Sequence, residues 1–68
     1  MRMIKELEDI HIQILDLLAS GYMQKQIAGF LSLDIQIQHD YLREIRFYYN
    51  AKTTVHAIAL WVRSNYED

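Results

Sequence analysis

The sequence predicts an all-α fold, a small four-helix bundle that makes up one domain. Helix-breaking residues are almost absent, since the 68 residues include no proline and only two glycines. Apolar residues recur at helical spacing in four segments, and typical cap residues stand between these segments. We therefore expect residues 1–68 to form a single domain, with residues 1–8 as an N-terminal arm.

The composition excludes several classes of protein. The chain has no cysteine, which rules out disulfides and thiolate metal sites. No apolar run approaches the roughly 18 residues of a membrane span, and acidic residues directly follow the N-terminal five residues, so there is no signal-peptide core. The three histidines form no metal-like cluster, and no catalytic motif is present. We expect a cytoplasmic protein that is not an enzyme and uses no metal, cofactor or membrane.

The first helix is predicted over residues 10–20, with Asp9 as its cap. Its apolar stripe consists of Ile10, Ile14, Leu17 and Leu18. His11 is expected on the opposite, polar side. Gly21 can adopt the left-handed conformation that closes a helix.

A short helix and a longer one follow, separated by a tight turn. The short helix is predicted over residues 23–31 and buries Ile27, Ala28 and Leu31. Asp34 can accept hydrogen bonds from free amides of the next helix, which is predicted over residues 35–49. A short helix, a turn and a longer helix together indicate a helix-turn-helix.

The third helix has two distinct faces. Its predicted inward stripe consists of Tyr41, Leu42, Ile45 and Tyr49, with Gln38 one turn earlier. Helical spacing places the other set on one outward strip, made of Gln36, His39, Asp40 and Arg43, with Arg46 further on.

The last helix is predicted over residues 55–65, with Thr53 or Thr54 as its cap after a left-handed Asn50. One apolar stripe, expected to face the core, consists of Val55, Ile58, Ala59 and Val62. A second stripe on another side consists of Ala57, Leu60 and Trp61. We expect this second stripe to be a dimer contact; alternatively, Trp61 folds back over the edge of its own domain.

The chain resembles the C-terminal DNA-binding domain of the LuxR/GerE family over roughly residues 7–62. The matching residues are Leu15, Leu17, Leu18, Ala19, Gly21, Lys25, Ile27, Ala28, Leu31, Leu33, Leu42 and Ile45. The resemblance implies a DNA-binding transcription regulator whose third helix enters the major groove and whose fourth helix forms a homodimer. By this resemblance and by charge, the DNA-facing residues are Lys25, Gln36, His39, Asp40, Arg43, Arg46 and Lys52.

Two functions remain open, because the net charge of −2 is unusual for a DNA-binding domain. In the first, the third helix reads double-stranded DNA, and Asp40 either accepts from a cytosine amino group or weakens binding by repelling phosphate; we favour the repulsion. In the second, the same fold binds another regulatory protein without touching DNA. That surface would consist of Ile35, Ile37, Phe47 and Tyr48.

Overall fold

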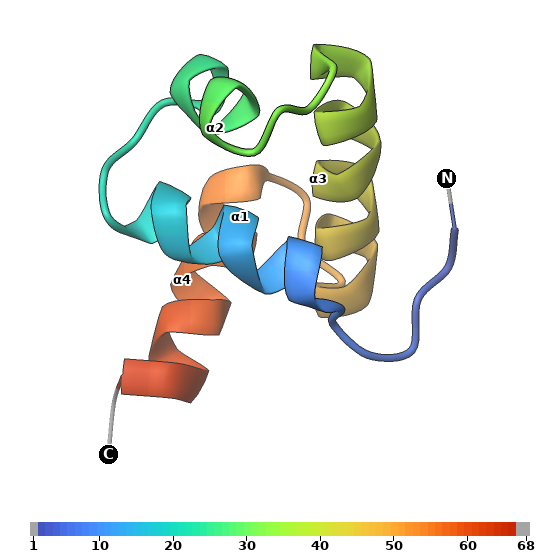
Figure 1. Ribbon diagram of the computed structural model, residues 1–68. Coiled ribbons are helices and arrows are strands. Elements are labelled where there is room, and N and C mark those ends of the chain that lie inside the picture. Colours follow the sequence, from blue (N-terminus) through green and yellow to red (C-terminus); the bar gives the residue numbers. More distant parts are fainter. Residues whose placement is uncertain (1, 67–68) are drawn as a thin grey trace.

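The computed structural model describes residues 2–66, and this part of the chain folds into four α-helices. They are α1 (Asp9–Ala19), α2 (Gln24–Phe30), α3 (Ile35–Tyr49) and α4 (Thr54–Tyr66) (Figure 1). This confirms the predicted all-α bundle. Residues 2–8 precede the first helix as the predicted arm, of which Met1 lies outside the described residues.

Helix α3 and its caps agree with the prediction. Its first turn is capped by Asp34, whose side-chain oxygen accepts a hydrogen bond from the Gln36 amide at 2.8 Å. Its end is closed by Asn50, which adopts the left-handed conformation at φ 52°, so that the next amide, that of Ala51, reaches the carbonyl of Arg46. Helix α4 is capped by Thr53, whose hydroxyl accepts from the His56 amide.

The start of α1 differs from the prediction. Glu8, not Asp9, is the cap residue, and α1 begins one residue earlier than expected. The Glu8 backbone amide donates to Nδ1 of His11 at 3.0 Å, so a histidine takes the reciprocal part that glutamate or glutamine plays in a capping box. At the other end, Gly21 has φ 99°, and the chain turns so that the Tyr22 amide bonds to the Leu17 carbonyl.

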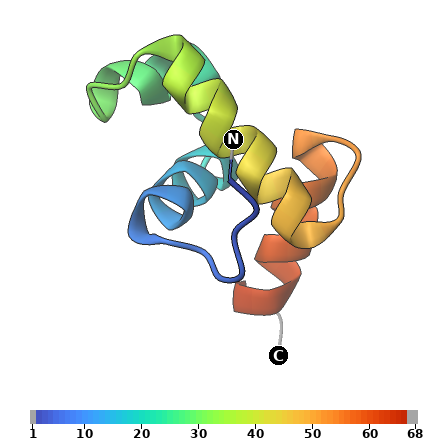
Figure 2. The same cartoon turned by 90° about the vertical axis from the view of Figure 1, so that its right-hand side faces the viewer.

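The four helices enclose one core. Helix α1 lies in the middle, α2 and the start of α3 lie above it, and α4 runs below it (Figure 1). Figure 2 shows α3 crossing the molecule, with the N-terminal arm passing beside it. The buried core residues are Ile14, Leu15, Ile27, Leu42, Ile45, Ala57 and Trp61.

The predicted apolar stripe of α1 faces the core: Ile14 is buried, and Ile10, Leu17 and Leu18 pack against the core as half-buried residues. One residue was predicted wrongly, because His11, expected on the polar side of α1, is fully buried. The reason is that α3 packs against the side of α1 on which His11, Ile14 and Leu15 recur at helical spacing.

On α4, each of the two predicted stripes is divided between the core and the surface. Ala57 and Trp61 lie in the core with 0% and 5% exposure, so they are not available as a dimer contact, while Leu60 is half-buried. Of the stripe expected inside, Ile58 and Val62 are half-buried against the core, whereas Val55 and Ala59 are exposed. The large Trp61 side chain is covered by its own domain, as in the alternative interpretation, and it stacks edge-on against Tyr66 with ring centres 5.6 Å apart.

Among the described residues, none of the helices combines the length and the apolar character needed to cross a membrane.

Candidate nucleic-acid interface

The outward strip of α3 is exposed to solvent. Gln36, His39, Asp40 and Arg43 all have exposed side chains, and Arg46 is half-buried one turn beyond them. Asp34 fixes the start of this helix, and the inward residues Leu42 and Ile45, at 4% and 1% exposure, fix its rotation. The strip therefore has a defined direction relative to the rest of the bundle.

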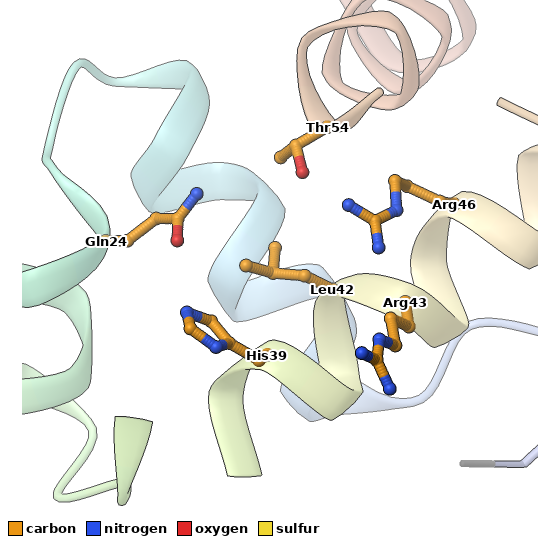
Figure 3. Close-up of a pocket in the computed structure, with 6 residues that line it drawn as sticks. All are labelled: Gln24, His39, Leu42, Arg43, Arg46 and Thr54. Atoms are coloured by element: carbon orange, nitrogen blue, oxygen red, sulfur yellow. The ribbon is translucent and has the colours of Figure 1, made fainter. Parts of the chain in front are cut away.

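Beside the strip, three helices meet around a hollow of about 270 Å³. It lies between the start of α2, the middle of α3 and the start of α4, and its lining consists of Gln24, His39, Leu42, Arg43, Arg46 and Thr54. In Figure 3 the Gln24 amide, the Thr54 hydroxyl and the Arg46 guanidinium surround Leu42, and Arg43 stands at the rim. We call this feature the α2–α3–α4 hollow.

The hollow is cationic. No carboxylate lines it, and within residues 2–66 neither Arg43 nor Arg46 forms an ion pair. Both arginines also border a second depression together with Phe47, Asn50 and Ala51. An arginine without a carboxylate partner keeps its full donor set for an anion from outside.

Gln38 holds α2 and α3 in register beneath this surface. It was predicted to face inward, and it is fully buried; its side-chain nitrogen donates to the backbone carbonyl of Gln24 at 2.8 Å. This bond ties the first residue of α2, which lines the hollow, to the helix that carries the arginines. The side-chain oxygen of Gln38 has no hydrogen-bond partner within residues 2–66.

The predicted interface residues fall into three groups. His39, Arg43 and Arg46 come together at the hollow. Gln36 and Asp40 lie with Arg43 on the exposed strip, on the turns that lead up to it. Lys25 and Lys52 are exposed but do not line the hollow.

Sequence reasoning missed a buried polar network behind α3. Glu44 is 4% exposed, and its Oε1 accepts from Nε2 of His11 at 2.8 Å and from the Arg2 guanidinium at 3.3 Å. Arg2 also bonds to Glu8 at 3.1 Å. Because the Glu8 amide donates to Nδ1 of His11, the ring hydrogen must be on Nε2, which donates it to Glu44.

The network shifts the ionisation of both carboxyl groups. Burial raises the pKa of Glu44, but the hydrogen bonds from His11 and Arg2 lower it by more, so the net shift is downward. The hydrogen bond from Arg2 lowers the pKa of Glu8. A charged Glu44 is thus compensated on the arm side of α3, and its charge is kept away from the outward strip.

Among residues 2–66, no three His, Asp or Glu side chains are placed to hold a metal ion. No protein-family model, curated protein or solved structure matches this chain.

Proposed function

We propose that this protein is a DNA-binding transcription regulator that inserts α3 into the major groove and acts as a dimer. The observation that carries the proposal is the sorting of charge on α3. Arg43 and Arg46 form no ion pair with any residue from 2 to 66, while Glu44, which lies between them in the sequence, is turned inward and paired with His11 and Arg2.

This sorting answers the objection raised by the acidic net charge. Between residues 22 and 56 the cations are Lys25, Arg43, Arg46 and Lys52, and with Glu44 buried the exposed carboxylates are only Asp34 and Asp40. The surface around the helix-turn-helix is therefore more basic than the composition indicates. A local basic face supplies the electrostatic part of DNA binding even where the whole chain is weakly acidic.

The strip offers groups suited to base edges. Arginine can bind guanine through two hydrogen bonds, and glutamine can bind adenine in the same way. Arg43 and Gln36 are both exposed on the strip, which supports such contacts. Asp40 can only accept, and because phosphates outnumber cytosine amino groups along a groove, we assign it the role of weakening binding to every duplex by repelling phosphate.

The test is a mobility-shift titration of a random-sequence duplex pool at low salt. Wild type is expected to shift the pool, and the affinity should fall steeply as salt rises. Arg43→Ala should reduce affinity by about 1–3 kcal/mol, while Asp40→Ala should raise it for every duplex. Lys5→Ala is the matched control, because it removes one charge from the N-terminal arm. Absence of a shift from wild type at low salt would refute the proposal.

The dimer contact is reassigned to the outer face of α4, because Ala57 and Trp61 are buried in the monomer. Val55 and Ala59 lie there one helical turn apart, and both are exposed. Val55 is 76% exposed, and Ala59 is small enough to let a second helix approach. Sedimentation at micromolar protein should show a dimer that Ala59→Glu converts to monomer with unchanged helical content. A wild-type protein that is monomeric at this concentration would refute the proposed dimer contact.

A protein-binding module remains the second candidate, and exposed apolar side chains favour it. Ile35, Ile37, Phe47 and Tyr48 are between 39% and 48% exposed, as this interpretation requires. If this is the function, wild type binds no duplex, and Ile37→Asp abolishes binding to another regulator.

A further inference from the structure

We propose that the α2–α3–α4 hollow seats one backbone phosphate of the DNA, and that Arg46 is the residue that clamps it. This inference rests on the proposed function. It divides the interface into a part that fixes the position of the duplex and a part that reads its sequence.

The lining groups select an anion that carries several acceptor oxygens. Arg46 offers a guanidinium, Gln24 an amide, Thr54 a hydroxyl and His39 a ring nitrogen. These groups can all donate hydrogen bonds, and no carboxylate among the lining residues competes for them. A planar guanidinium matches two oxygens of a phosphate group at once.

The donors come from three different helices, which sets the position of the bound group. Gln24 is the first residue of α2, Arg46 lies on α3, and Thr54 is the first residue of α4. The Gln38 side chain bonds the start of α2 to α3, so two walls of the hollow are held together from below. A group bound here is located relative to the whole bundle and not to a single flexible side chain.

The floor and the size of the hollow also fit a phosphodiester. Leu42 closes the floor and is 4% exposed, so the floor is apolar and the donors stand around it. A volume of about 270 Å³ is many times the roughly 30 Å³ share of a water molecule. There is room for a phosphate with part of the adjoining sugar.

The place of the hollow indicates DNA phosphate as the source. Arg43 belongs both to its rim and to the outward strip of α3. With the strip in the major groove, the hollow therefore meets the strand that borders the groove. Contacts to phosphate fix register and orientation, while contacts to base edges carry sequence information. Arg46 should accordingly control affinity without controlling sequence preference.

The experiment measures fluorescence anisotropy of several labelled duplexes that differ in sequence, over a series of salt concentrations. Arg46→Ala is expected to weaken all duplexes equally, by about tenfold at low salt, and to reduce the slope of log affinity against log salt by about one. Arg46→Lys keeps the charge but loses the planar guanidinium that binds two oxygens at once. It should bind more tightly than Arg46→Ala but less tightly than wild type, with the salt slope of wild type. Thr54→Val should cause a smaller, equally uniform loss. The matched control is Lys5→Ala.

The outcomes separate this inference from the proposed function. If wild type binds no duplex, the proposed function fails. If wild type binds but Arg46→Ala loses no more affinity than Lys5→Ala, or loses it only for some sequences, the phosphate seat is refuted while DNA binding stands. Binding of the free anion is tested by adding inorganic phosphate and measuring the melting temperature at each concentration. Stabilisation by millimolar phosphate that depends on Arg46, without any duplex binding, would overturn the assignment to DNA.

Discussion

Replacing Gln38 with leucine should stabilise the protein. The side chain is fully buried between α2 and α3, and its oxygen has no partner among the described residues. A buried acceptor left unsatisfied costs about 1–3 kcal/mol, and leucine removes this cost. The substitution also removes the hydrogen bond from Gln38 to the Gln24 carbonyl, which contributes about 0.5–1.5 kcal/mol.

The balance favours leucine by about 1 kcal/mol, since the apolar side chain is of similar volume and adds buried apolar surface. The Gln24 carbonyl does not lose its last donor, because the first carbonyl of a helix accepts from the amide four residues on. In a domain of this size, a gain of 1 kcal/mol raises the melting temperature by about 4–8 °C.

Urea unfolding followed by circular dichroism measures the change, with Gln36→Leu as the matched control. Gln36 lies on the same helix but is exposed, so its replacement should change the free energy of unfolding by less than about 0.5 kcal/mol. A loss of stability in Gln38→Leu of 1 kcal/mol or more would refute the reasoning. It would mean that the bond between α2 and α3 outweighs the unsatisfied oxygen.

Three further predictions concern the core and the buried network. Ile27→Ala should cost about 2–5 kcal/mol and largely unfold the protein, whereas Leu18→Ala, at a half-buried position, should cost less; melting curves compare them. Trp61→Glu should abolish the helical signal instead of producing a folded monomer, because the charge would be buried. Folding lowers the pKa of Glu44 from its ordinary value of 4.5. The charged Glu44 carboxylate therefore stabilises the folded protein above pH 4.5, and this stabilisation is lost as the pH falls through the lower pKa of the folded state. Glu44→Gln should remove this contribution to the pH dependence of the free energy of unfolding.

The backbone could be predicted from the sequence to within one residue at every helix end. Local signals decide these ends: an aspartate before α3, an asparagine after it, and a glycine with φ 99° after α1. Such caps act through the nearest few amides and carbonyls, so they can be recognised without knowledge of the tertiary fold. The exposed strip of α3 followed from helical spacing for the same reason.

The faces of α1 and α4 could not be assigned in this way. Both helices carry apolar residues on more than one side, and only packing decides which side becomes the core. For α1 a signal was present: His11 precedes Ile14, Leu15 and Leu18 by three, four and seven residues, so it completes a helical stripe. Treating histidine as polar hid this stripe. The hollow was not predictable, since it brings together Gln24, Arg46 and Thr54 from separate helices.

The imidazole of His11 has a consequence for how the protein folds. One ring nitrogen holds the amide that starts α1, and the other holds a carboxylate on α3 that is distant in the sequence. The ring is held in this orientation only when α3 packs against α1, so the cap of the first turn of α1 is not stabilised in the isolated segment. Local and long-range structure should then form in one step. The Glu8 amide stands at a helix end, where fraying is usual. Its hydrogen should nevertheless exchange with solvent slowly, at the rate set by opening of the whole domain.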